Sequence, residues 1–284
     1  MLKKLVPAIL VLALALMSCG VSVNLPTTVP PGPTVTDPIS VPLPSDPTQT
    51  VDLTLTFGAG SLKLTPGAQA LVEGTVTYNF SDFKPSVVVA PGSVSISQGN
   101  WQMSGIPDLS KIKNEWDLSL GPAPLNLTVD GGAYQADYQF GGLALANLTI
   151  KDGAATSKVD FSAPNATQMS LLSYETGASN VSLTELGNAN FSSLEFSSGA
   201  GNYTLDFTGT LKRDASIHIT TGVSNLTLVI PQGVPAQITT QGGLSNVTHD
   251  AGWSQNKNVY TQPGTGPQLT FVIEIGAGNL TLTR

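Results

Sequence analysis

Few residues of this sequence could take part in chemistry. Its 284 residues include two histidines and one cysteine, and only 11% of them are charged. Motifs for zinc hydrolysis, a serine nucleophile, phosphate binding or a redox dithiol do not occur. The acidic residues do not follow the spacing of a calcium-binding repeat either. We therefore expect no metal ion, no cofactor and no enzymatic activity.

One charged group has the composition of a hydrolytic site. Lys212, Arg213 and Asp214 are consecutive, and Asp206 precedes them. Enzymes that cleave polysaccharides on a β-helix use acids and an arginine on the solenoid face. Paired catalytic carboxylates must lie within about 5 to 10 Å of each other, and the spacing of Asp206 and Asp214 does not place them on adjacent coils. We interpret the group as a charged turn and keep a polysaccharide-acting β-helix enzyme as the alternative function.

The remaining candidates are histidines and aromatic residues. His218 alternates with Ile217 and Ile219, which predicts that it faces solvent. His249 faces inward or marks the edge of a loop. Trp253 and Tyr260, in a segment rich in Gly, Asn and Pro, are candidate ligand contacts because their rings could stack on sugars. They could equally pack that segment onto the last coil.

A short block that recurs along the chain organises everything else. It reads Gly-x-(Ser/Gly)-Asn and is followed by alternating apolar and hydroxyl residues, with copies beginning at Gly177, Gly199, Gly222, Gly243 and Gly276. The first four copies are separated by 22, 23 and 21 residues. A repeat period in this range predicts stacked structural units.

The pattern predicts that each repeat consists of a strand, a corner, a second strand and a return turn. Glycine and asparagine suit a corner because both tolerate left-handed backbone. The fold we predict is an all-β solenoid with single-stack, β-helix-like repeats and an N-terminal β cap region, and a β-sandwich is the structural alternative. In a solenoid the corner asparagines would form a ladder with a spacing of about 4.8 Å. The members of this ladder are Asn180, Asn202, Asn225, Asn246 and Asn279.

The N-terminus predicts export and lipidation. A basic start precedes an apolar run from Leu5 to Leu16, which is too short for a transmembrane helix, and Leu16-Met-Ser-Cys19 follows. This pattern resembles a bacterial lipoprotein signal in which Cys19 carries the lipid. Removing residues 1–18 takes away two lysines and no acid, so the formal net charge changes from −7 to −9. Such an acidic chain is not expected to bind nucleic acid.

We divide the chain into four parts. Residues 1–18 are the signal peptide, and residues 19–50 form a tether with eight prolines after residue 20. Residues 51–115 form an N-terminal β region, in which 84–97 predicts two strands around Pro91-Gly92 and 106–116 predicts a helical turn. Residues 116–284 are the solenoid repeats. Asp250 to Pro267 exceed the repeat length and are expected to bulge from the stack.

Several of these segments together resemble the bacterial toast-rack family. The family is similar in turn to the C-terminal domain of LiaF-type cell-wall-stress proteins and to candidate β-solenoid adhesin domains. The resemblance covers residues 51–284, contains no catalytic motif and implies a surface β-repeat protein. The segments that carry it are 58–64, 84–87, 94–98, 114–120 and 205–214, which read GAGSLKL, KPSV, VSISQ, NEWDLSL and LDFTGTLKRD.

These features together predict a non-enzymatic lipoprotein on the extracytoplasmic face of the cell membrane. Its partners would be the membrane, through the lipid on Cys19, and an envelope glycan or protein. The expected role is binding, adhesion or envelope structure. Envelope-stress sensing through a protein partner is a second alternative, beside the polysaccharide-acting enzyme.

Overall fold

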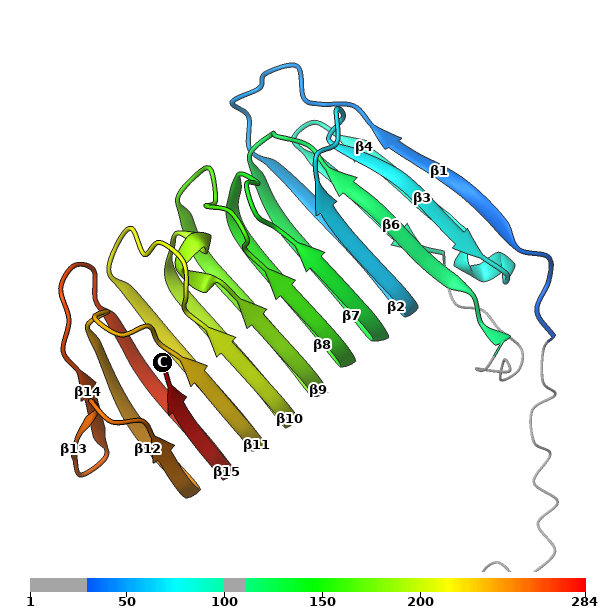
Figure 1. Ribbon diagram of the computed structural model, residues 1–284. Helices are drawn as coiled ribbons and strands as arrows, with labels where there is room; N and C mark the ends of the chain where they lie inside the picture. Colours follow the sequence, from blue (N-terminus) through cyan, green and yellow to red (C-terminus); the bar gives the residue numbers. More distant parts are fainter. Residues whose placement is uncertain (1–29, 100–110) are drawn as a thin grey trace, which may run out of the picture.

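The computed structural model describes residues 30–99 and 111–284, which form one 15-stranded sheet (Figure 1). The predicted all-β solenoid is confirmed, and the β-sandwich is wrong. Single 3-10 turns lie at η2 (Ser81–Phe83) and η4 (Leu186–Ala189). The strands are β1 (Val35–Val41), β2 (Val51–Pro66), β3 (Val72–Tyr78), β4 (Pro85–Ala90), β5 (Ser93–Gln98), β6 (Asn114–Leu120), β7 (Leu125–Gln139), β8 (Leu145–Asp160), β9 (Met169–Thr184), β10 (Phe191–Asp206), β11 (Ala215–Val229), β12 (Ala236–His249), β13 (Ser254–Asn256), β14 (Val259–Gln262) and β15 (Leu269–Thr283).

The long strands form a parallel stack with one strand in each coil. From β2 the order is β7, β8, β9, β10, β11, β15 and β12, as Figure 1 shows. The register equals one sequence repeat, because Asn202 lies opposite both Asn180 and Asn225. The sequence period therefore appears directly as the stacking of equivalent residues.

Each coil contains one bent strand rather than the two strands that the repeat predicts. In β9, inward residues alternate up to Thr176, Gly177 and Ala178 both face outward, and alternation resumes at Ser179. Two successive outward residues turn the strand without ending its hydrogen bonding to the neighbouring coils. The repeat block is therefore a bend inside a strand.

The core lies inside the bend and is closed at four of the long strands by the residue that follows the strand. Phe140, Phe161, Phe207 and Ile230 come directly after β7, β8, β10 and β11, and all four side chains are buried. Their N–H groups donate to carbonyl groups of the next coil, for example from Phe207 to Val229 at 2.8 Å. The return loops therefore continue the stacking that the strands begin.

The last two long strands do not stack in chain order. β15 is inserted between β11 and β12, so the coil of Gly276 precedes the coil of Gly243 in space. The connection between them contains the hairpin of β13 and β14, which pairs antiparallel with the first part of β12. The extra residues 250–267 thus form the end of the sheet and carry the chain back into it.

The folded region begins at an earlier residue than predicted. β1 lies within the predicted tether, pairs with β3, and buries Ile39 and Val41. The predicted start of the folded region at Val51 is therefore wrong. The boundary after residue 115 is not a break in the sheet either. β2 pairs with β7 in the stack, and β6 pairs with β3 at the N-terminal end.

Two predictions concern short segments of the N-terminal β region. The two strands around Pro91-Gly92 are β4 and β5, as predicted. Of the helical turn predicted for 106–116, residues 106–110 lie outside the described residues and Asn114–Trp116 belong to β6. In the part of the chain that the structure describes, no helix has the length and hydrophobicity to cross a membrane.

Candidate functional site

The bend of each coil depends on a column of glycines. A Cβ atom on Gly199 would lie 2.5 Å from the carbonyl oxygen of Gly177, and one on Gly222 would lie 2.4 Å from that of Gly199. Neither glycine has a left-handed φ angle. Glycine is required here by close approach of adjacent backbones, not by the left-handed conformation predicted for the corner.

The asparagines of the repeat block form a ladder on the outer surface. The Nδ2 atom of Asn202 donates to Oδ1 of Asn180 at 2.9 Å, that of Asn225 to Asn202 at 3.0 Å, and that of Asn279 to Asn225 at 2.8 Å. Asn246 lies in register with Asn279 but donates to Thr248 instead. None of the five is left-handed, so the ladder lies on extended strands and does not satisfy turn backbone groups.

A second column of hydroxyl residues lies two positions after the asparagines, on the same side of the strands. Its members are in register across β9, β10, β11, β15 and β12. We call the two columns together the Asn–Thr face. The face contains no ionisable side chain and consists of Asn180, Ser182, Asn202, Thr204, Asn225, Thr227, Asn279, Thr281, Asn246 and Thr248.

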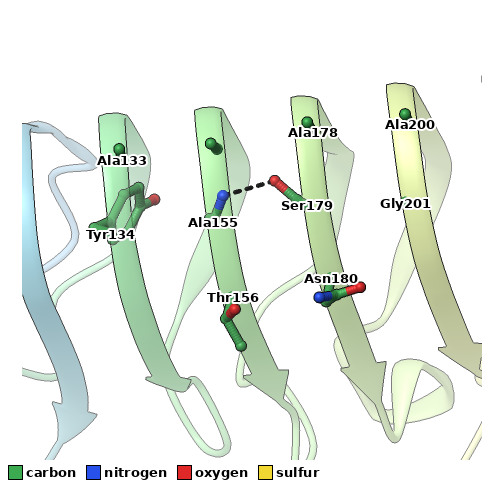
Figure 2. Close-up of a pocket in the computed structure, with 10 residues that line it drawn as sticks. Ala133, Tyr134, Ala155, Thr156, Ala178, Ser179, Asn180, Ala200 and Gly201 are labelled. Carbon is green, nitrogen blue, oxygen red and sulfur yellow. Dashed lines mark hydrogen bonds between the residues drawn. The ribbon is translucent and has the colours of Figure 1, made fainter.

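A shallow groove of about 510 Å³ borders the Asn–Thr face at β7 to β10. Its floor includes the outward alanines that follow the bends, among them Ala154, Ala178 and Ala200. Figure 2 shows Ala133, Ala178 and Ala200 in a row across the strands, with Thr156 and Asn180 further along. Small side chains keep the backbone of the bends accessible beside the polar columns.

A buried acid lies inside the bend beneath this groove. Tyr134 and Tyr174 donate hydrogen bonds to the two carboxylate oxygens of Asp152, and the Tyr134 and Tyr138 hydroxyls are 2.9 Å apart. Burial raises the pKa of Asp152, against the opposing effect of the two tyrosine donors. Burial also raises the pKa of all three phenols. The cluster joins β7, β8 and β9 and is buried, with Asp152 only 8% exposed.

Trp253 and Tyr260 are not exposed ligand contacts. Their side chains are 7% and 4% exposed and belong to the hydrophobic core. Tyr260 also packs edge-on against His249, with ring centroids 5.9 Å apart. The prediction of sugar stacking is therefore wrong, and the alternative, that these rings pack the segment onto the last coil, describes their positions.

The charged group around Asp214 is divided among separate structural contacts. Asp206 accepts a hydrogen bond from the N–H of Thr208 at 2.8 Å, and Asp214 accepts one from Gln268 at 2.8 Å. The Nε of Arg213 donates to Asn190 at 3.0 Å. These contacts fix loops, as the charged-turn interpretation expects. Within residues 30–99 and 111–284, no three His, Cys, Asp or Glu side chains gather closely enough to hold a metal ion.

Three predicted positions remain: Cys19 and the two histidines. Cys19 lies outside the described residues, so its lipidation stays a prediction. His218 is exposed on β11, and His249 is partly buried at the end of β12.

The amides that satisfy the backbone groups of the return loops were not predicted. The Asn165 side chain bonds both backbone groups of Leu145, and Asn188 donates to the carbonyl of Phe161 at 2.9 Å. Both are buried. Their only signal was their position shortly after a strand, which the surface repeats obscured.

Comparison with known proteins places this fold in a family. The family model described as the N-terminal domain of toast_rack, DUF2154, matches residues 31–171 and 164–229, which together span more than half of the chain. The chain therefore belongs to the toast-rack family. Two overlapping matches to one domain model agree with the internal repetition. Comparison with curated protein sequences finds no match.

Three solved structures are similar in part. A candidate cell adhesion protein from Clostridium sporogenes is 18% identical, with 88% of this chain and 99% of that chain covered and a TM-score of 0.49. A candidate adhesin from Bacteroides fragilis is 12% identical, with 89% and 99% covered and a TM-score of 0.37. A candidate lipid binding protein from Parabacteroides distasonis is 12% identical, with 89% and 99% covered and a TM-score of 0.40.

Proposed function

We propose that this protein is a non-enzymatic lipoprotein of the extracytoplasmic membrane face, whose Asn–Thr face binds an envelope polymer. The single observation that supports this is the repetition of one outward, uncharged pair of side chains on five adjacent strands. Burial explains the repetition of the inward residues, but it does not require the outward residues to be the same.

The ladder leaves hydrogen-bonding capacity for a partner. An asparagine amide has two donor hydrogens and two acceptor lone pairs. Asn202 and Asn225 each use one donor and one acceptor within the ladder. One N–H and one lone pair of each therefore remain available to a ligand. A hydroxyl-rich chain that runs along the stack would meet the same pair of groups about every 4.8 Å.

Binding of this kind depends on repetition. A single exposed hydrogen bond contributes about 0.5 to 1.5 kcal/mol because water competes for the same groups. Several identical sites along one polymer raise the overall affinity without any new type of contact. An extended envelope glycan suits this arrangement better than a small molecule does.

Anchoring by Cys19 would hold the face at the membrane. An anchor with two or more acyl chains gives stable membrane association. Cys19→Ser is expected to move the protein from the membrane fraction to the soluble fraction. If the variant still sediments with membranes, and the wild-type protein carries no lipid by mass spectrometry, anchoring through Cys19 is wrong.

A glycan array combined with a reducing-sugar assay tests the binding function. The mature chain, residues 19–284 with Cys19→Ser, is expected to bind extended neutral glycans and to release no reducing ends. Release of reducing ends that is lost in Asp214→Asn would instead support the polysaccharide-acting enzyme. Absence of glycan binding, together with capture of one envelope protein, would support stress sensing through a protein partner.

A further inference from the structure

Exposed apolar side chains are concentrated at the N-terminal end of the sheet. Seven large hydrophobic residues are exposed among those that the structure describes, and five of them belong to β1, β4 or the segment after β1. The other two, Val223 and Val272, lie singly on the stack. The five are Val35, Leu43, Val87, Val88 and Val89.

Three of these residues are consecutive on β4. Val87, Val88 and Val89 are 40%, 59% and 59% exposed. Val87 lies opposite Ile96 and Val89 opposite Val94, and both of those β5 side chains are buried in the core. The inner, apolar face of the sheet therefore continues onto β4, where it is left uncovered by the described residues.

β4 also has a free edge in the described part of the chain, since it pairs only with β5. Natural sheets protect such edges with charges, proline, bulges or short strands. The other ends of this sheet have these protections. β1 contains Asp37 and Pro38, β13 has three residues, and β12 is irregular after Gly242. β4 has no charge and no bulge, and its proline is the first residue.

We propose that β4 pairs antiparallel with β4 of a second copy of the chain, about a two-fold axis through Val88. In this register Val88 lies opposite itself and Val87 lies opposite Val89 of the other copy. The inner faces of the two sheets then join into one apolar surface. A two-fold interface needs a surface that is complementary to itself, and an uncharged strand of valines meets that condition.

Charges beside β4 fit the same pairing. Lys84, which is exposed, would lie opposite Gly92 of the other copy. Gly92 accepts a hydrogen bond from the N–H of Asp52 at 3.0 Å and lies against the side chain of Gln49. Gln49 in turn closes a turn with the exposed Asp46 at 3.1 Å. Each copy would thus place a lysine at the acidic turn of its partner, twice by symmetry.

Sedimentation velocity of residues 19–284 with Cys19→Ser, over a range of concentrations, tests the proposal. We expect a monomer–dimer equilibrium that Val88→Lys weakens by about tenfold or more, because two lysines would then lie opposite each other. Val223→Lys is the matched control, since Val223 is 65% exposed on β11, away from β4. The control is expected to leave dimerisation unchanged.

A charge exchange distinguishes this register from other contacts. Lys84→Asp alone and Asp46→Lys alone should each weaken the dimer, and the double variant should restore it. A wild-type chain that stays monomeric at all concentrations would overturn the proposal. So would a dimer that is insensitive to Val88→Lys, or a double variant that is no stronger as a dimer than the single variants.

Discussion

The Asn–Thr face and the N-terminal end belong to one sheet but differ in what they expose. In the stack, similar coils bury their apolar residues, and the Asn–Thr face presents uncharged amides and hydroxyls. At the N-terminal end, β2 pairs with both β5 and β6, the β1–β3, β3–β6 and β4–β5 pairs are antiparallel, and valines are exposed. This difference matches the two roles we propose: binding of a repetitive ligand by the regular coils and pairing with a single partner at the irregular end.

Substitution of bend glycines should give the largest difference in unfolding free energy between the two regions. Gly199→Ala places a methyl group 2.5 Å from a backbone oxygen of the preceding coil, and the stack must shift to accept it. We expect a loss of about 3 kcal/mol in unfolding free energy, measured by chemical denaturation. Gly58→Ala, in the equivalent position of β2, meets the side chain of Gln98, which can rotate away.

The Gly58→Ala variant serves as the control for that experiment, with an expected loss of about 1 kcal/mol from the disturbed bond between its N–H and Gln98. Equal losses for the two variants would mean that close stacking of backbones is not what distinguishes the regular coils.

Substitution of one asparagine in each region should give the next largest difference in unfolding free energy. Asn114, at the N-terminal end, is 1% exposed; it donates to Ala59 at 2.7 Å and accepts from the Trp116 indole at 3.0 Å. Asn114→Ala leaves both partners unsatisfied in the core, and we expect a loss of about 2 kcal/mol. Asn202→Ala should cost about 1 kcal/mol or less, because water can replace the ladder bonds of an exposed residue.

Thermal denaturation of the two asparagine variants would check this order. A larger loss for Asn202→Ala than for Asn114→Ala would contradict the assignment of the ladder to a surface role and would make it a determinant of stability.

A third difference concerns pH and the buried acid of the stack. Burial raises the pKa of Asp152 in the folded protein. The folded state therefore holds this proton more tightly than the unfolded state, and stability decreases as the pH rises above the unfolded pKa of about 3.9. The slope from one proton is at most about 1.4 kcal/mol per pH unit.

Asp152→Asn removes this titration, so the variant should lose less stability than the wild-type chain between pH 4 and pH 7. The measurement is the midpoint of urea unfolding at several pH values. Parallel pH profiles for the two proteins would contradict the raised pKa.

Much of the fold could be predicted because the repeat period reports stacking directly. Gly177, Gly199 and Gly222 gave the register of adjacent coils, and alternation beside them gave the strands. The insertion of β15 between β11 and β12 could not be predicted, because the block around Gly276 resembles the other blocks and does not indicate which coils it lies between. β1 was missed because Pro38 and the prolines on either side of the strand are typical of a tether, although Ile39 and Val41 alternate toward the core.

The candidate site was predicted less well, for a physical reason. The asparagines were found as a set, but their conformation was not, since Gly and Asn also suit turns. Trp253 and Tyr260 were predicted as ligand contacts because aromatic rings can stack on sugars. In a protein with 6% aromatic residues, however, these large side chains are buried in the core. Which face of a strand is exposed follows from its neighbours in space, and the sequence order of β12 and β15 concealed those neighbours.

We propose that the Asn–Thr face, rather than another outer surface of the same strands, binds the envelope. The most direct test compares two double variants of equal charge in binding to isolated cell envelopes. Thr204→Lys with Thr227→Lys alters the face, and Ser197→Lys with Thr220→Lys alters exposed residues of β10 and β11 before the bend. We predict that the first pair weakens binding by about tenfold, or about 1.4 kcal/mol, and the second leaves it unchanged. Equal weakening by both pairs, or none by the first, would contradict the claim.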